Sequence, residues 1–375
     1  MHLYLHIPYC RKACHYCDFH FSTNLSTRES LVDAMIREIA LRKDYLPQKK
    51  LSTIYFGGGT PSVLTAEELD RLLSEIARHF SIDEAAEITL EANPDDLDAQ
   101  TLLNLHQAGI NRLSIGIQTF DNEMLRYLNR IHTGEESEIV VKRAQDTGIR
   151  NLSLDLMYAL PAPDHTLLER DLEKITSLGV SHLSAYCLTI EPRTAFGKWV
   201  ETRKMAPIDE DFAAEQFEIT VNTLAEAGYE QYEISNFARD DQFSRHNTAY
   251  WQRRPYLGIG PGAHSYDGQR TRQFNVSNNN QYIESLRRNE IPATVEELRP
   301  EDQANEYLLT GLRTRWGCDL DLLDRLSDGS FRELRRSQVK ELLSRGWLQL
   351  TDNTLFLTPA GKLFADRAAT ELFLD

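Results

Sequence analysis

The chain has 375 residues and a formal net charge of -16 at pH 7, which argues against non-specific binding to nucleic acid or to an anionic membrane, since both require basic patches. No apolar run approaches the roughly 20 residues of a membrane-spanning helix, and the N-terminal residues lack the basic flank and the length of a signal peptide. We therefore expect a cytoplasmic protein with one large domain and one smaller domain.

Short apolar strands alternate with amphipathic helices along the first half of the chain. The predicted strands are residues 3–7, 53–56, 88–92, 112–117, 151–156 and 182–188. The predicted helices between them include residues 28–44, 66–80, 136–147 and 167–178. Six strand–helix repeats predict a parallel sheet with right-handed crossovers.

Each of these strands has one apolar face and one face that is polar or small. In the first strand Leu3, Leu5 and Ile7 share a face, while Tyr4 and His6 share the other. A closed eight-stranded barrel fills its interior with branched apolar side chains, and this sequence places polar ones there. The pattern predicts an α/β fold whose core is a partial (β/α)6 barrel with an open ligand cavity. The polar face is also compatible with strand caps or a solvent-facing edge.

The second half of the chain is less regular. We expect a helix over residues 209–227, and we expect a long loop over residues 266–280 after the glycine-rich run GIGPGAHS at 258–265. Helices over 306–313, 321–326 and 331–345 precede a hairpin over 347–358 whose turn is Asp352-Asn353. This order is typical of a winged-helix-like α+β domain. The predicted segments are 1–195 (barrel core), 196–295 (barrel extension) and 296–375 (C-terminal domain).

Three cysteines follow the first strand in a C-x3-C-x2-C array formed by Cys10, Cys14 and Cys17. Three thiolates on one tight loop suit three corners of a [4Fe–4S] cluster and leave one iron open. A zinc site completed by His15 or His20 is an alternative, although no second ligand pair follows. A disulfide would require an oxidising compartment.

The two remaining cysteines stand alone. We expect Cys187 and Cys318 to be small buried apolar residues.

Polar and glycine residues gather at the ends of the predicted strands. The triplet that begins GGGTP (57–61) lets backbone groups approach a ligand, although tight turns also use glycine. Glu91, Gln118, Arg130 and Asp155 form a set that suits a zwitterionic nucleoside, because arginine can bind a carboxylate and an aspartate can bind ribose hydroxyls. Taken alone, Arg130 is equally compatible with a surface ion pair.

Together these motifs resemble the radical S-adenosylmethionine (SAM) superfamily, and nearly the whole chain resembles its oxygen-independent coproporphyrinogen III oxidase branch. The runs that carry the second resemblance are LHIPYC (5–10), GGGTP (57–61), RLSIGIQTF (112–120) and DLMYALP (155–161). The resemblance implies that the three cysteines bind the cluster and that SAM chelates the fourth iron. It also implies SAM contacts from Tyr4, Tyr16, Gly58, Gly59, Thr60, Glu91, Gln118, Arg130 and Asp155.

Two features depart from the oxidase. The oxidase has a cysteine two residues after the third ligand, where this chain has Phe19, and it has an N-terminal extension ahead of the first strand. The same positions resemble the haem-chaperone branch, which shares the C-x3-C-x2-C-x-F loop and an H-N-x-x-Y-W motif. That resemblance implies a haem site at His246, Asn247, Tyr250 and Trp251.

The chemistry of the H-N-x-x-Y-W motif agrees with haem, because imidazole is a good axial ligand for haem iron and aromatic faces pack on a porphyrin. A cap at His246 and a core position for Trp251 are the structural alternative. We expect a haem chaperone that transfers haem to an acceptor such as a respiratory haemoprotein, with a homodimer as one possible assembly. The competing hypothesis is a radical SAM enzyme that acts on a porphyrin, and Phe19 favours the chaperone.

Overall fold

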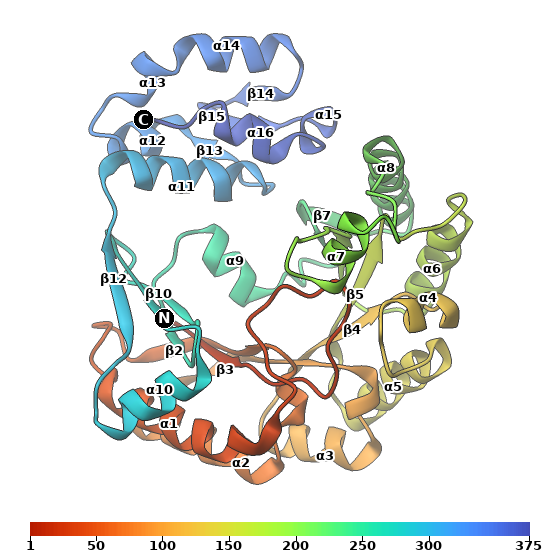
Figure 1. The fold of residues 1–375 in the computed structure, drawn as a ribbon. Coiled ribbons are helices and arrows are strands. Elements are labelled where there is room, and N and C mark those ends of the chain that lie inside the picture. Colours follow the sequence, from red (N-terminus) through yellow and green to blue (C-terminus); the bar gives the residue numbers. More distant parts are fainter.

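The computed structural model describes residues 1–375 and contains two sheets (Figure 1). The large sheet has 12 strands in the order β12-β11-β10-β9-β1-β2-β3-β4-β5-β6-β8-β7, and the small sheet has three strands in the order β13-β15-β14. The predicted α/β class and the partial barrel are confirmed.

Six parallel strands form the centre of the large sheet, paired in chain order. They are β1 (His2–Ile7), β2 (Lys50–Gly58), β3 (Ser81–Ala92), β4 (Arg112–Gln118), β5 (Asn151–Tyr158) and β6 (His182–Cys187). The face of β1 that carries Leu3, Leu5 and Ile7 is fully buried, as its alternation predicted. β3 begins at Ser81, seven residues before the predicted start at residue 88. The sequence did not reveal this first part of the strand because it is largely exposed and lacks an apolar alternation.

Helices cover the outside of these strands (Figure 1). They are α1 (Arg28–Leu41), α2 (Ala66–His79), α3 (Ala99–Gln107), α4 (Asn122–Tyr127), α5 (Gly134–Thr147) and α6 (Thr166–Ser177). Local sequence fixes two of their starts through capping boxes, in which a threonine side chain and a glutamate three residues later bond each other's backbone N–H. These pairs are Thr65 with Glu68 in α2 and Thr133 with Glu136 in α5.

Residues 196–295 add strands to both edges of the sheet. Their elements are α7 (Ala195–Glu201), α8 (Glu210–Glu226), β7 (Glu230–Glu233), β8 (Asn236–Ala238), α9 (Arg245–Trp251), β9 (Tyr256–Ile259), β10 (His264–Tyr266), β11 (Thr271–Asn275), α10 (Asn279–Arg287) and β12 (Ala293–Glu297). The loop predicted over 266–280 is wrong, since this stretch holds β11 and the start of α10. β11 lies near the sheet edge and is half-exposed, so it carries few apolar residues.

The C-terminal residues pack around a second hydrophobic core of 16 buried residues. Its elements are α11 (Pro300–Leu312), β13 (Cys318–Asp319), α12 (Leu320–Leu326), α13 (Phe331–Leu334), α14 (Arg336–Ser344), β14 (Leu348–Thr351), β15 (Thr354–Leu357), α15 (Pro359–Lys362) and α16 (Ala365–Thr370). The single helix predicted over 331–345 is two helices that meet at Arg335. The predicted hairpin turn is correct, and both of its residues have positive φ, as a type I′ turn requires. No helix of the chain has the length and apolar character needed to cross a bilayer.

Candidate functional site

A cavity of about 600 Å³ opens at the carboxyl ends of the central strands. In a parallel sheet all of these ends lie at one edge, which is where α/β folds bind ligands. Eleven of the twelve residues predicted for the cluster and for SAM line it: Cys10, Cys14, Tyr16, Cys17, Gly58, Gly59, Thr60, Glu91, Gln118, Arg130 and Asp155.

Tyr4 is the predicted residue that does not line this cavity. It lies beneath it, stacked on the ring of Tyr55, with its hydroxyl 3.1 Å from Nδ1 of His6.

The cysteine loop leaves β1 and is anchored by backbone bonds on both sides. Cys10 N–H donates to the carbonyl of Ser22 at 3.0 Å, and His15 N–H donates to the carbonyl of Leu128 at 3.2 Å. Burial raises the pKa of the Cys10 thiol to about 11, and binding to iron would deprotonate it. The loop thus holds three thiols at the rim of one cavity.

The alternative zinc site is not assembled in the structure, although the hydrogen bond that each candidate histidine makes through one ring nitrogen does not prevent ligation through the other. Nδ1 of His15 is hydrogen-bonded to the carbonyl of Tyr127 at 2.9 Å, and Nε2 of His20 is hydrogen-bonded to Oδ1 of Asn279 at 2.8 Å. No three His, Cys, Asp or Glu side chains converge closely enough to hold a single metal ion. A cluster requires no such convergence, because each thiolate binds a different iron.

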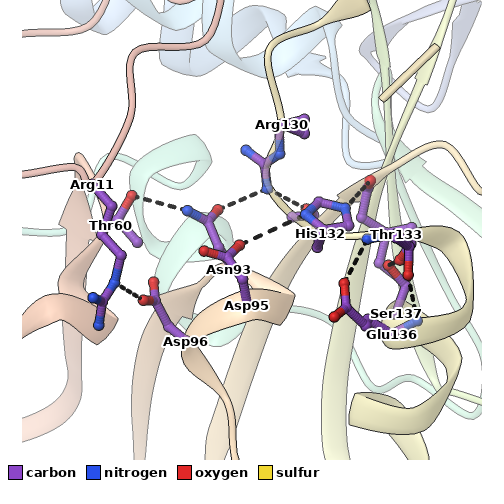
Figure 2. Close-up of polar contacts among 12 residues, drawn as sticks. Arg11, Thr60, Asn93, Asp95, Asp96, Arg130, His132, Thr133, Glu136 and Ser137 are labelled. Atoms are coloured by element: carbon purple, nitrogen blue, oxygen red, sulfur yellow. Dashed lines mark hydrogen bonds and ion pairs between the residues drawn. The ribbon is translucent and has the colours of Figure 1, made fainter. Parts of the chain in front are cut away.

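Two side chains lie against the cysteine sulfurs. Thr60 Oγ1 donates to Cys10 Sγ at 3.3 Å, and Arg130 Nη1 donates to Cys14 Sγ at 3.6 Å. Asn93 joins these two groups, because its Nδ2 donates to Thr60 Oγ1 at 3.3 Å and its Oδ1 accepts from Arg130 Nη2 at 2.7 Å (Figure 2). Hydrogen bonds of this kind orient and tune metal ligands.

Arg130 is therefore not part of a surface ion pair. It lines the cavity and also donates to the carbonyl of Gly116 at 2.6 Å. Sequence reasoning did not assign Asn93 a role, although its place directly after the β3 strand is the signal that would have found it.

The glycine triplet brings β2 against the start of the cysteine loop. Gly59 N–H donates to the carbonyl of Ile7 at 2.8 Å, and Thr60 N–H donates to the carbonyl of Tyr9 at 2.7 Å. A Cβ at Gly59 would lie 2.7 Å from Tyr9 O, which is closer than side chains tolerate. Gly58 has a φ of +109°, which favours glycine.

Two acidic side chains face the cavity from adjacent parts of the barrel. Glu91 accepts from the Tyr55 hydroxyl at 2.7 Å and from Gly58 N–H at 3.2 Å. Asp155 accepts from the Ser114 hydroxyl at 3.2 Å. Burial raises the pKa of Glu91 to about 7 and the pKa of Asp155 to about 6. Both carboxyls are thus poised near neutral pH, with oxygens that can accept from an ammonium group or from ribose hydroxyls.

The expectation that Cys187 is buried is wrong. It is exposed and lines the same cavity, next to Tyr186 and Leu188. Cys187 is the last residue of β6, and the burial of the first four residues of this strand does not extend to its last two. Cys318 is buried in the C-terminal core, as expected. Phe19 also lines the cavity and is 73% exposed.

The predicted haem residues lie on α9, outside the cavity. His246 is 1% exposed, and both ring nitrogens are occupied: Nδ1 lies 2.6 Å from Thr53 Oγ1 and Nε2 lies 2.9 Å from the Tyr250 hydroxyl. Burial lowers the pKa of His246 well below its ordinary value, so the imidazole is neutral. Asn247, Tyr250 and Trp251 are half-buried.

Helix α9 connects to the cavity through one side chain. The ring of His246 packs on the ring of Tyr55 with 4.9 Å between centroids, and Tyr55 donates to Glu91. Another side of α9 lines a second cavity of about 290 Å³, where Arg245 and Arg254 supply positive charge.

Comparison of the sequence with known proteins identifies related families and relatives. The family model described as the radical SAM superfamily matches residues 4–194, and the model described as the HemN C-terminal domain matches residues 298–364. The chain is 35% identical over 366 residues to a Bacillus subtilis protein named heme chaperone HemW, covering 97% of this chain and 96% of that protein. It is 34% identical over 389 residues to the heme chaperone HemW of Escherichia coli, covering 99% of this chain and 97% of that protein.

A solved structure shares the fold. Coproporphyrinogen III oxidase (HemN) from Escherichia coli, described as a radical SAM enzyme, superposes with a TM-score of 0.85 and covers 99% of this chain and 89% of its own. The sequence identity of 23% limits this comparison to the fold.

Proposed function

The chain belongs to the radical SAM superfamily and, within it, to the family of the HemW haem chaperones, and from this premise we propose that it binds haem and transfers it to an acceptor haemoprotein. The observation that carries the proposal is the alignment with proteins named heme chaperone HemW over 97% and 99% of the chain. We place this activity in the cytoplasm and take a respiratory haemoprotein as the expected class of acceptor.

We further propose that the large cavity holds a [4Fe–4S] cluster and SAM. The residues fit these groups, since three cysteines share one rim with two hydrogen-bond donors aimed at their sulfurs. When bound, the cluster and SAM supply one-electron chemistry. Arg130 would bind the SAM carboxylate, Glu91 its ammonium group, and Asp155 the ribose hydroxyls. In these roles the three side chains would orient SAM within the cavity.

The haem site is proposed at α9, and the buried state of His246 defines how it would work. Its two ring nitrogens are hydrogen-bonded within the protein, so axial ligation requires that the contact with Thr53 or with Tyr250 opens. The adjacent cavity carries Arg245 and Arg254, which suit the two propionate carboxylates of haem. We propose that haem binding displaces α9 and frees the imidazole.

Haem uptake by the full chain tests this proposal. Protein reconstituted anaerobically with iron and sulfide is titrated with haem, and the absorption spectrum gives the stoichiometry. His246→Ala should abolish stoichiometric uptake, and Tyr250→Phe should increase the affinity because it releases Nε2. His264→Ala, which removes an exposed histidine, is the matched control. Uptake that His246→Ala leaves unchanged removes this residue as the ligand.

Assays of haem transfer and of catalytic turnover distinguish a haem chaperone from an enzyme. Haem-loaded protein should deliver one equivalent to an apo-haemoprotein, followed by the rise of the acceptor's spectrum. The reduced protein with SAM and coproporphyrinogen III should give no multiple-turnover conversion to protoporphyrinogen, because Phe19 occupies the position of the oxidase's additional cysteine. Repeated turnover would overturn the chaperone proposal. A size measurement with and without iron tests whether the cluster controls formation of a homodimer.

A further inference from the structure

Arg112 is among the largest side chains buried in the protein, and its location is inside the barrel. It is the first residue of β4 and is 1% exposed. In the sheet register it pairs with Thr89 of β3, so Glu87 and Glu91 flank it two residues to either side on the same face. Ser114, two residues further along β4, shares that face and reaches the cavity. Arg112 therefore lies beneath the proposed SAM site.

The Nε atom of the Arg112 guanidinium has no hydrogen-bond partner, and none of the ion pairs of the protein, which join charged atoms at 4.0 Å or less, includes Arg112. Burying an arginine without a partner is costly unless charges at slightly longer range compensate.

The charges that surround Arg112 belong to the site above it. Burial raises the pKa of Glu91 and of Asp155, and the positive charge of Arg112 opposes this rise in both. On its other side, Glu87 accepts from the N–H groups of Arg245 and His246 at 3.2 and 3.1 Å, at the start of α9.

We propose that Arg112 is a positioning residue of the SAM site, whose buried positive charge favours the ionised forms of Glu91 and Asp155, in which both accept hydrogen bonds from SAM. The proposal rests on the SAM site proposed above. It assigns Arg112 no contact with SAM, because the cavity lining includes Glu91, Ser114 and Asp155 but not Arg112.

Other titratable or charged groups also face the two carboxyls. Those that interact electrostatically with Glu91 or Asp155 are Tyr4, Tyr55, Arg130, Tyr186 and Tyr250. His182 and His246 interact with Arg112. Burial raises the pKa of the tyrosines and lowers that of the two histidines, so these groups are neutral near pH 7. Arg130 is the second cation; it is hydrogen-bonded to Asn93 and to the Gly116 carbonyl, and its charge also acts on Asp155. Arg112 is the buried cation whose charge acts on both carboxyls.

The test is the pH dependence of SAM binding to the reconstituted protein, measured by equilibrium dialysis from pH 5.5 to 9. Wild-type affinity should rise as the pH increases through about 6 to 7, the range in which the two carboxyls ionise. Arg112→Met should move this midpoint upward by about one to two pH units and weaken binding at pH 7 about tenfold. Arg112→Lys, which keeps the charge, should retain most of the wild-type profile.

Controls separate the possible failures. Arg150→Met makes the same change at an exposed arginine and should leave SAM binding unchanged. If Arg112→Met does not fold, Arg112→Gln and Arg112→Lys provide the same comparison of an uncharged with a charged side chain. A wild-type protein that does not bind SAM removes the proposed site itself. Wild-type binding with an unchanged profile in Arg112→Met or Arg112→Gln overturns the role of Arg112 alone.

Discussion

Replacement of Gly59 by alanine probes how closely β2 must approach the cysteine loop. The new Cβ would lie 2.7 Å from Tyr9 O, 2.9 Å from Ile7 O and 2.9 Å from Tyr9 N. All three are backbone atoms of the segment that leads into Cys10, so no side chain can rotate away. Ordinary contacts of this kind are about 3.5 Å long, so the two strand ends must separate by about half an ångström or more.

The expected cost has a structural and a functional part. Overpacking of this kind costs about 1–3 kcal/mol of unfolding free energy, and the separation also stretches the two hydrogen bonds that Gly59 and Thr60 donate across it. A binding site loses function when its groups move by about 0.5 Å. We therefore expect Gly59→Ala to lower both the iron bound per chain and the affinity for SAM, the latter at least about tenfold.

The matched control is Gly109→Ala. Gly109 has a φ of +90° and nothing within 4 Å of a new Cβ, so alanine there costs about 1–2 kcal/mol of backbone strain without touching the site. Urea unfolding, iron and sulfide content, and SAM dialysis are measured for both variants. Our reasoning is refuted if Gly59→Ala binds iron and SAM as Gly109→Ala does.

Three further predictions concern stability. The buried Glu38 carboxylate accepts from Arg42 Nη1 at 3.2 Å and from the Asn275 amide at 2.8 Å, so Glu38→Ala should cost about 3–5 kcal/mol in urea unfolding because it leaves a buried cation unpaired. Removing Glu38 and Arg42 together should cost less than Glu38→Ala, and an equal or larger cost would contradict this account. Because the pKa of Glu91 is raised in the folded chain, the folded chain binds more protons than the unfolded chain between about pH 4.5 and 7. The contribution of this carboxyl to the free energy of unfolding is complete below that range and is lost as the pH rises through about 7. Relative to Glu91→Gln, the wild type should lose about 1–2 kcal/mol between pH 5.5 and 8, and parallel pH profiles for the two proteins would argue against it. Asn353 adopts a φ of +67° in the terminal hairpin, and Asn353→Gly should stabilise the domain by a few tenths of a kcal/mol, with destabilisation in thermal unfolding as the contrary result.

Local sequence determined the parts of this protein that depend on neighbours in the chain. Strand alternation identified the six parallel strands, because the side-chain period of two is a local property. The cysteine spacing and the strand-end residues identified the cavity lining, since parallel strands end at a common edge. The family resemblance inferred from these motifs is confirmed by the match over residues 4–194.

Tertiary structure alone decided the features that depend on distant packing. The periodicity around Cys187 is that of a buried strand, and only the end of β6 at the cavity exposes it. Residues 271–275 form a strand because β10 and β12 flank them, not because their own sequence is apolar. The sequence motif suggests that His246 is available as a ligand, but in the structure its Nδ1 is hydrogen-bonded to Oγ1 of Thr53, 193 residues away in the chain. The sequence gives Arg112 no evident role, and the role that we propose for it depends on the sheet register, which pairs it with Thr89 and places Glu87 and Glu91 on either side.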